Sequence, residues 1–433
     1  MLYTKIQEKK AILGVLGLGY VGLPLAVEKA NAGFKTVGYD IQKDKVDLVN
    51  SGINYIGDIL DDELKNLVET KRLSATDDIS FVSKCDAVAI CVPTPLDEHQ
   101  SPDISYVIDS AESIVPFIHK DMIIILESTT YPGTTEELLK PILEKSGLIC
   151  GKDFYLAFSP ERVDPGNKIY NTKNTPKVVG GVTSDCGKIA ALLYESILEA
   201  PVHLVSSPAV AEMEKILENT YRNVNIGLIN ELAILAHEMK IDIWEVIEAA
   251  KTKPYGFQAF YPGPGLGGHC IPLDPYYLSW KAREYGFHTT IIENSMVIND
   301  RMPKYTVDRC AEILNDNKLP LNGSKILVLG VAYKQDIDDY RESPALKVIE
   351  ELEKRKTVVE FYDPYVNEFN FKGHRKIGLS TLTKYDLQSA DLVLITTAHS
   401  NIDYEYVYNN STLIFDTKNV MKDLKNRENL FVL

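Results

Sequence analysis

Short apolar runs alternate with helical patterns over the first part of the chain. Between residue 11 and about residue 200, each apolar run ends at Gly, Asp, Pro or Ser before a helical pattern begins. This alternation is typical of a doubly wound parallel sheet. The predicted strands are Ala11–Leu16, Lys35–Tyr39, Ala87–Cys91, Met122–Leu126 and Phe154–Phe158.

A long helical pattern follows. From Pro208 to about Met239 apolar residues recur at helical spacing, and Gly227 is the glycine within the stretch. We predict one helix that links two domains and offers a surface for a dimer, because a helix of this length exceeds one small domain. Two shorter helices, broken near residues 225–227, are the alternative.

A second α/β block begins after Asn315. Its predicted strands are Lys325–Leu329, Val358–Tyr362, Leu392–Thr396 and Thr412–Phe415. The fold class is therefore predicted to be α/β, with two Rossmann-like doubly wound domains joined by a long central helix. The predicted domains span residues 1–205, 206–314 and 315–433.

Composition narrows the class of partner. The 433 residues suit two or three domains, and 45% hydrophobic with 25% charged residues is typical of a soluble globular protein. A formal net charge of -15 argues against nucleic-acid and anionic-membrane partners, because those surfaces require clustered Lys and Arg.

The N-terminus and the cysteines indicate a compartment. The sequence begins without a signal-peptide pattern, and no apolar run approaches the roughly 18 residues that span a bilayer. We therefore expect a cytoplasmic protein whose six cysteines are reduced thiols. None forms a CxxC pair, so no metal site is predicted.

A dinucleotide fingerprint follows the first predicted strand. The segment reads Gly17-Leu-Gly19-Tyr20-Val21-Gly22, and Asp40 closes the second strand. The first glycine permits the tight turn, the second lets the backbone approach a pyrophosphate, and the third lets helix pack on strand. Asp40 would bond ribose hydroxyls and repel a 2′-phosphate, which favours NAD over NADP. Lys45 either helps to bind a phosphate or is a solvated helix charge.

A glycine-rich loop carries a candidate nucleophile. Four glycines between Gly263 and Gly268 precede Cys270, and glycine at such density favours close approach of the backbone to another group. The alternative is a buried structural cysteine. On the long helix, Lys215 and Asn219 share one face at a spacing of four residues. Lys215 is either directed into a site or snorkels at an edge.

Further polar clusters follow predicted strands. Thr129 lies in Glu-Ser-Thr-Thr-Tyr-Pro-Gly, and Glu161 with Arg162 lies in Ser-Pro-Glu-Arg, both at strand ends where ligands of open α/β sheets bind. In the last block, Lys334 and Arg341 precede Ser343-Pro344, which would begin a helix whose N-terminus favours anions. A solvated charged turn is the alternative. His269 adjoins Cys270 but receives no catalytic role.

Taken together, these motifs resemble the signature of the UDP-glucose/GDP-mannose 6-dehydrogenases over nearly the whole chain. They are GxGxxG, VPTP, ESTxxPG, SPER, AExxKxxxN and GGHCIPxDP, in that order. The resemblance is strongest to the branch that oxidises UDP-N-acetylglucosamine. It implies NAD as cofactor, with Pro93 and Thr94 among its contacts, a UDP-sugar substrate and a homodimer.

The resemblance also implies residue roles. A water held by Asp274 and Thr129 takes the proton of the C6 alcohol, and Cys270 attacks the resulting aldehyde. Glu161 assists the water that hydrolyses the thioester after a second oxidation. Oxyanions are stabilised by Lys215 and Asn219. The implied substrate contacts are Arg162, Gly267, Lys334 and Arg341.

One departure bears on the substrate. UDP-glucose dehydrogenases carry an arginine upstream of the glycine loop where this chain has Lys253-Pro-Tyr-Gly256. UDP-N-acetylglucosamine is therefore predicted, with UDP-N-acetylmannosamine and UDP-glucose as alternatives. A two-electron NAD enzyme and an NAD-sensing module remain as rival classes, and neither requires Cys270.

Overall fold

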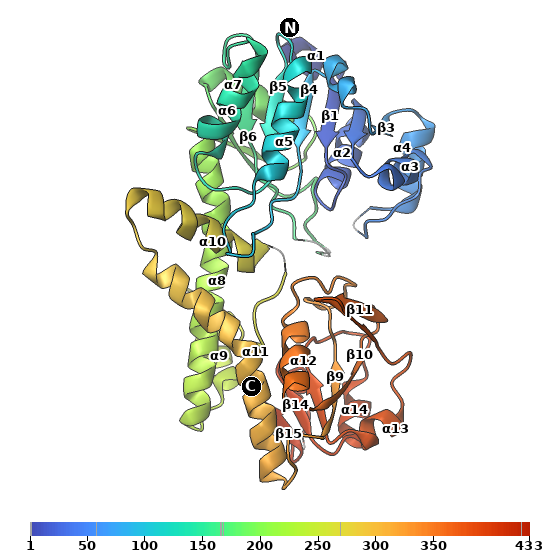
Figure 1. Cartoon of the computed structure of the whole chain (residues 1–433), viewed down its shortest axis with the longest axis vertical. Helices are drawn as coiled ribbons and strands as arrows, with labels where there is room; N and C mark the ends of the chain where they lie inside the picture. The colour runs from blue at the N-terminus through green and yellow to red at the C-terminus, as the bar shows by residue number, and fades with distance from the viewer. Residues whose placement is uncertain (1, 58, 165–166, 168, 269, 426) are drawn as a thin grey trace. The chain divides into compact units, whose positions relative to one another are not determined.

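The computed structural model describes residues 2–57, 59–164, 167, 169–268, 270–425 and 427–433. They form two compact units, drawn in Figure 1. The first comprises Met1–Glu218 with Tyr276–Phe287, and the second comprises Asn219–Pro275 with His288–Leu433. The division into three domains made from the sequence stays a prediction.

The first unit is built on an eight-stranded sheet with strand order β3-β2-β1-β4-β5-β6-β7-β8. Its described pairs are parallel apart from β6 with β7, which is antiparallel. The five strands predicted here are confirmed to within one residue at either end, whereas β3, β7 and β8 were not predicted. The strands are β1 (Ile12–Leu16), β2 (Lys35–Tyr39), β3 (Leu73–Thr76), β4 (Ala87–Ile90), β5 (Ile123–Leu126), β6 (Tyr155–Phe158), β7 (Lys177–Gly181) and β8 (Val202–Val205).

Helices cover both faces of this sheet. Alternate residues of β4 and β5 enter two separate apolar clusters, because successive side chains of a strand point to opposite faces. One cluster includes residues of α1, α2, α3, α4 and α7, and the other includes residues of α5 and α6. The helices are α1 (Leu2–Gln7), α2 (Gly22–Asn31), α3 (Lys43–Asn50), α4 (Asp61–Glu69), α5 (Ser105–Ile114), α6 (Lys140–Leu143) and α7 (Ser184–Glu195).

The predicted long helix is confirmed as α8 (Pro208–Glu238), so the alternative of two broken helices is wrong. In the second unit it packs against α11 (Thr290–Asp316). A Cβ on Gly227 would lie 3.0 Å from the Cβ of Ser295, so glycine is what permits this close approach. Buried amides join the same two helices, since Asn230 Nδ2 donates to Asn299 Oδ1 at 2.9 Å.

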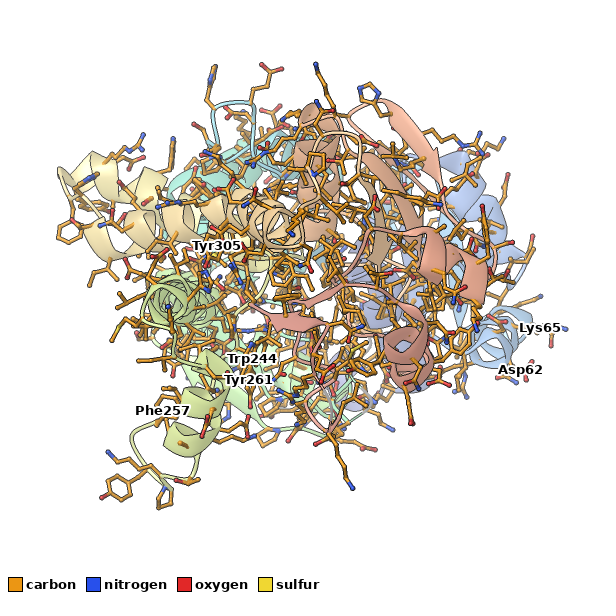
Figure 2. The ribbon with its side chains drawn as sticks, turned by 90° about the horizontal axis from the view of Figure 1, so that it is seen from below. Asp62, Lys65, Trp244, Phe257, Tyr261 and Tyr305 are labelled. Atoms are coloured by element: carbon orange, nitrogen blue, oxygen red, sulfur yellow. The ribbon has the colours of Figure 1, made fainter. Side chains whose placement is uncertain are left out.

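Two shorter helices complete the helical part of the second unit. They are α9 (Ile243–Lys251) and α10 (Cys270–Ala282), of which α10 continues into the first unit. Trp244 of α9 stacks on Tyr261 with ring centroids 5.9 Å apart. Both residues are labelled in Figure 2. The Trp244 indole N–H also donates to the Leu433 carbonyl at 3.0 Å, which ties the C-terminus to α9.

The second unit also holds a five-stranded parallel sheet with strand order β10-β9-β13-β14-β15. The four strands predicted for this block are confirmed within two residues, and β15 and the β11–β12 hairpin were not predicted. The elements are β9 (Lys325–Leu329), β10 (Val358–Tyr362), β11 (Glu368–Phe371), β12 (His374–Ile377), β13 (Leu392–Ile395), β14 (Ile414–Asp416), β15 (Leu430–Val432), α12 (Pro344–Lys354), α13 (Lys384–Ser389) and α14 (Tyr404–Asn410). Two Rossmann-like sheets and a long helix thus match the predicted fold class.

Candidate active site

The glycine fingerprint forms the turn from β1 to α2. Gly17 has φ +90°, and a Cβ there would lie 2.6 Å from the Cys91 carbonyl oxygen. A Cβ on Gly22 would lie 1.8 Å from the Gly17 carbonyl oxygen. Around Gly19, by contrast, a Cβ would meet nothing within 4 Å. The turn is therefore closed at its two ends and open at its middle glycine, which suits the approach of a pyrophosphate.

Asp40 braces this turn from the end of β2. Its carboxylate is buried and accepts the Leu18 N–H at 3.0 Å and the Gln42 N–H at 2.9 Å. Lys45 Nζ lies 3.6 Å from the same carboxylate. A fixed carboxylate at the end of the second strand, beside an open glycine turn, fits the adenosine ribose of NAD. The predicted phosphate role of Lys45 stays a prediction.

The segment that follows β4 is anchored through its backbone. Tyr277, buried on α10, donates its hydroxyl to the Thr94 carbonyl at 2.8 Å. Ser128 Oγ donates to the Val92 carbonyl at 2.7 Å. Pro93 and Thr94 thus lie in a fixed loop at the carboxyl edge of the first sheet, where the predicted cofactor contacts belong.

The loop that carries Thr129 is held by α8. Glu212 is fully buried, and its carboxylate accepts the N–H groups of Gly133 at 2.6 Å and Thr135 at 2.9 Å. Thr135 Oγ1 donates to it at 2.7 Å. Burial raises the pKa of Glu212, although these three donors oppose the rise. Glu212 therefore holds the loop after β5 on the helix that also bears Lys215.

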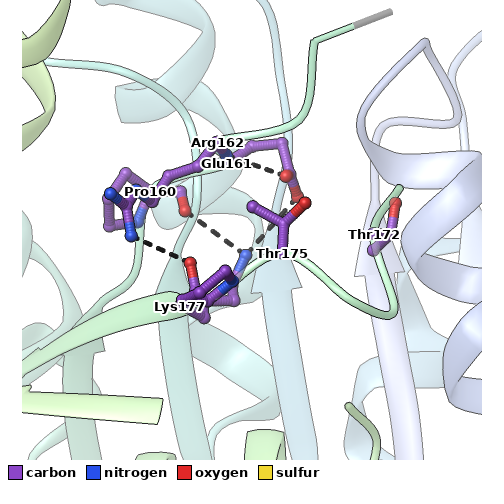
Figure 3. Close-up of a pocket in the computed structure, with 7 residues that line it drawn as sticks. Pro160, Glu161, Arg162, Thr172, Thr175 and Lys177 are labelled. Atoms are coloured by element: carbon purple, nitrogen blue, oxygen red, sulfur yellow. Dashed lines mark hydrogen bonds and ion pairs between the residues drawn. The ribbon is translucent and has the colours of Figure 1, made fainter. Parts of the chain in front are cut away.

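Glu161 lies in the loop after β6 with its carboxylate fixed on two sides. One oxygen accepts the N–H groups of Arg162 at 2.8 Å and Val163 at 2.9 Å. The other lies 3.4 Å from Lys177 Nζ. Figure 3 marks this interaction with a dashed line. Burial raises the pKa of Glu161, but Lys177, the two N–H groups and Lys215 outweigh burial and leave the pKa below its ordinary value.

The Arg162 guanidinium is bound by the protein itself. It donates to the Pro176 carbonyl at 2.9 Å, pairs with Glu218 and lies 3.4 Å from Glu214. Both glutamates belong to α8. These three partners already engage the guanidinium of Arg162. The predicted contact of Arg162 with the substrate stays a prediction.

Asn219 and Asp274 are brought together although 55 positions separate them in sequence. Asn219 Nδ2 donates to Asp274 Oδ2 at 2.5 Å, and both side chains are buried. Lys215 precedes Asn219 by one turn of α8 and is also buried, so it does not snorkel at an edge.

Cys270 is the first residue of α10, one turn before Asp274. All six cysteines lie within the described residues, and Cys270 is exposed whereas the other five are buried. The alternative of a buried structural cysteine is therefore wrong. A helix N-terminus carries partial positive charge, which favours a thiolate over a thiol.

The glycine loop before Cys270 packs against the start of α12. A Cβ on Gly267 would lie 2.7 Å from Pro344 Cδ, and one on Gly268 would lie 3.1 Å from the Tyr333 ring. Ser343 caps α12 by accepting the Ala345 N–H, which confirms the predicted helix start. His269 lies outside the described residues.

Two predicted substrate contacts are close to this meeting point in sequence. Lys334 follows Tyr333 directly, and Arg341 precedes the cap of α12 by two residues. The Arg341 guanidinium pairs with Asp339 through two hydrogen bonds of 2.9 and 2.7 Å. The second unit thus joins the loop that bears Cys270 to the segment that bears both predicted cations.

Sequence reasoning missed several residues that hold the site. Lys177, Tyr194 and Tyr277 were not singled out, and Glu212 appeared only as a letter of a motif. A single sequence gives little signal for them, because a lysine at the start of a strand and a tyrosine in a helix are ordinary surface residues. Their burial is what marks them.

A dinucleotide-binding turn with a fixed carboxylate after the second strand of a doubly wound sheet is typical of an NAD-dependent enzyme. Three models of one family match the chain: the NAD binding domain over residues 11–198, the central domain over 209–301 and the UDP binding domain over 327–423. The chain therefore belongs to the UDP-glucose/GDP-mannose dehydrogenase family, and it is an NAD-dependent oxidoreductase of nucleotide sugars.

Individual relatives match over most of their length. The chain is 38% identical to a UDP-N-acetyl-D-glucosamine 6-dehydrogenase of Pseudomonas aeruginosa, over 90% of both chains. It is 35% identical to a UDP-N-acetyl-D-mannosamine dehydrogenase of Pyrococcus horikoshii, over 95% of this chain and 96% of the relative. A solved structure of UDP-D-ManNAc dehydrogenase from Pyrococcus horikoshii superposes with a TM-score of 0.88 at 34% identity, covering 97% of this chain and 98% of the other.

Among the residues that the structure describes, no helix is both long enough and apolar enough to cross a bilayer.

Substitution of Gly19 should weaken NAD binding, whereas substitution of Gly22 should destabilise the fold. Gly19→Ala adds a methyl group to open space, so we expect an unchanged midpoint of thermal unfolding and NAD affinity lower by about tenfold or more. Gly22→Ala places its methyl group on the Gly17 carbonyl, so we expect a loss of stability on the order of 1–3 kcal/mol. Thermal melts with and without NAD measure both. Normal NAD affinity in Gly19→Ala would contradict the assignment of the turn.

Proposed function

We propose that the protein oxidises the C6 alcohol of UDP-N-acetylglucosamine to the carboxylate, with transfer of four electrons to NAD. The observation that carries the proposal is the exposed thiol of Cys270 at the start of α10. The next turn of α10 bears Asp274, which pairs with Asn219 of α8. A thiol in this position allows a covalent intermediate, which a two-electron oxidation of an alcohol would not need.

The first oxidation requires a base for the C6 hydroxyl proton. A water held by Asp274 and Thr129 takes this proton, and Asn219 keeps the Asp274 carboxylate oriented. NAD supplies the acceptor for the hydride that leaves C6. Lys215 and Asn219 donate to the oxygen as it gains negative charge.

The second oxidation uses the thiol. Cys270 Sγ, as the thiolate, forms a bond to the aldehyde carbon while the former carbonyl oxygen takes up a proton. The thiohemiacetal then loses that hydroxyl proton and a hydride, for which a second NAD would be the acceptor, and becomes a thioester. Water then attacks the thioester carbonyl with help from Glu161, the C–S bond breaks, and the uronic acid leaves. The covalent bond to Cys270 explains how the aldehyde stays on the enzyme between the two oxidations.

The UDP portion is proposed to bind beside the glycine loop of the second unit. Lys334 and Arg341 contribute positive charge there, and Gly267 offers backbone without a side chain. Arg162 is proposed to contact the sugar end. Support comes from the packing of this loop on Tyr333 and Pro344, which joins the phosphate-binding segment to Cys270.

The proposed identity of the sugar rests on the similarity of this chain to its relatives. The relatives named above include enzymes for UDP-N-acetylglucosamine and for UDP-N-acetylmannosamine, at similar identity. UDP-N-acetylmannosamine is therefore the second candidate, favoured by the superposition with a TM-score of 0.88. The segment Lys253–Gly256, where UDP-glucose dehydrogenases carry an arginine, disfavours UDP-glucose.

A homodimer in the cytoplasm is proposed as the working form. Support comes from a run of exposed apolar side chains along α8, because monomers rarely leave such a stripe in water. These side chains are Val210, Met213, Leu217, Tyr221, Leu228, Leu232 and Leu235.

Counting NADH tests the reaction. With UDP-N-acetylglucosamine as limiting substrate, we expect two NADH per sugar, because each of the two oxidations transfers one hydride. Parallel reactions with UDP-N-acetylmannosamine and UDP-glucose identify the substrate. One NADH per sugar would make the protein a two-electron enzyme, and no NADH from any donor would remove the assigned activity.

Cys270→Ser tests the covalent step. We expect turnover to the acid to fall by at least about a hundredfold, because a hydroxyl is a much weaker nucleophile than a thiolate. The readout is formation of the uronic acid. Cys150→Ser is the matched control, since it makes the same change at a buried cysteine and should keep turnover. Full turnover in Cys270→Ser would contradict the mechanism.

Leu228→Glu combined with Leu232→Glu tests the dimer. Both side chains are exposed on α8, and two charges in an apolar contact should convert the dimer to a monomer. Light scattering after size exclusion measures the mass. Leu60→Glu is the control, because Leu60 is also exposed but lies outside α8. A dimer that survives both charges would place the interface elsewhere.

A further inference from the structure

Lys177 is a buried lysine with two carboxylate neighbours. It is the first residue of β7, and its side chain is 5% exposed. Nζ lies 2.7 Å from Glu127 Oε2 and 3.4 Å from both Glu161 Oε2 and the Pro160 carbonyl oxygen. Burial lowers the pKa of Lys177, but the two carboxylates outweigh burial and keep it above its ordinary value. The lysine therefore stays charged.

Glu127 fixes the position of this ammonium group. Its side chain is fully buried at the end of β5, and one oxygen accepts the hydroxyl of Tyr194 from α7 while the other meets Lys177. The Lys177 ammonium also lies 5.0 Å from the centroid of the Tyr194 ring. Strand β7, helix α7 and the end of β5 thus define together where the charge of Lys177 lies.

We infer that Lys177 is a positioning residue for Glu161, holding its carboxylate in place and in the charged form while Glu127 and Tyr194 hold Lys177. The inference rests on the proposed function, in which Glu161 assists the water that hydrolyses the thioester. Arg162 and Val163 N–H groups fix one Glu161 oxygen and Lys177 approaches the other, so the carboxylate has one preferred orientation.

The hydrolytic step balances with this arrangement. The water oxygen bonds to the thioester carbon, one water proton passes to Glu161, and the C–S bond breaks to release the Cys270 thiolate. The proton then leaves Glu161 for solvent as the product carboxylic acid ionises. A carboxylate protonated in advance could not accept the water proton, so the charge of Lys177 is required at the lower end of the working pH range.

Other charged groups also act on Glu161. Lys215 from α8 lowers its pKa, while Arg162 pairs electrostatically with it. Glu127, which follows β5, pairs with Lys177, and the fully buried Lys29 from α2 attracts Glu127. Cys91, which follows β4, is a thiol whose pKa burial raises, so it stays neutral. Among these groups Lys177 makes the largest contribution that keeps Glu161 charged.

Lys177→Met tests the inference through the pH profile of turnover. Without the ammonium group, burial of Glu161 loses its largest offset, so the pKa of Glu161 rises and the acid limb of kcat should move to higher pH by about one unit or more. We expect kcat to fall by about tenfold with KM for the UDP-sugar little changed. Intact-protein mass spectrometry after acid quench should detect the thioester accumulating on Cys270.

Two further variants control for folding and charge. Lys177→Arg keeps the positive charge and should restore the acid limb of the unmodified enzyme. The double variant Lys177→Met with Glu127→Gln removes both buried charges together, so it should fold even if the single variant unfolds. Its acid limb of kcat should still move to higher pH. Thermal melts confirm that each variant is folded.

The possible results distinguish failure of the positioning role of Lys177 from failure of the proposed function. If the unmodified enzyme produces NADH from a UDP-sugar but neither Lys177→Met nor the double variant moves the acid limb or accumulates thioester, the positioning role is overturned alone. If the unmodified enzyme reduces no NAD with any UDP-sugar, the proposed function is overturned and the positioning role with it.

Discussion

Buried carboxylates that accept backbone N–H groups hold the loops of both Rossmann-like sheets. Asp40 ends β2 and accepts the Leu18 N–H of the first glycine turn. Asp363 follows β10 and accepts the N–H groups of Val331 and Ala332 in the corresponding turn of the second sheet. Charge-assisted bonds of this kind are stronger than neutral ones, and the buried ionised acid tolerates burial only while its donors stay in place. The same constraint therefore fixes both ligand-binding turns.

Glu212 and Glu161 extend this principle from the cofactor turn to the reacting end of the site. Glu212 fixes the loop that bears Thr129, and Glu161 folds back onto the N–H groups that follow it. The two acids differ in how their charge is compensated. Burial raises the pKa of Glu212, whose neighbours are neutral donors, whereas a lysine keeps the pKa of Glu161 low. Glu212 is suited to holding backbone, and Glu161 is suited to staying ionised, as its proposed role requires.

Much of the fold was predictable because its signals are local. The strand Lys35–Tyr39 and the helix that begins at Pro208 follow from the spacing of apolar residues alone. The antiparallel strand β7 was missed because its partner, β6, ends at Phe158, well before β7 begins at Lys177, and nothing in the sequence reveals which edge a short strand joins. Strand β8 has exposed and half-buried residues only, so it lacks the apolar run that would have marked it.

The candidate site was predictable where a motif carries its own chemistry and obscure where the chemistry depends on burial. Gly17, Gly22 and Cys270 could be identified from their neighbours in sequence. The pairing of Asn219 with Asp274 could not, since it depends on how α8 meets α10. Lys177 gives no sequence signal at all, because a lysine at the start of a strand becomes informative only once its side chain is known to be enclosed by acids.

Acidic partners also limit how much each cation can contribute to the binding of two anionic ligands in a chain with a net charge of -15. Lys45 lies beside Asp40, Arg162 beside Glu218, and Arg341 beside Asp339. A phosphate that meets such a cation competes with a carboxylate already in place, so the net electrostatic gain is smaller than for an unpaired cation. Backbone N–H groups of the first glycine turn add the favourable charge of a helix N-terminus. Affinity for the pyrophosphates is therefore expected to come from backbone and cations together, with the paired cations serving mainly orientation.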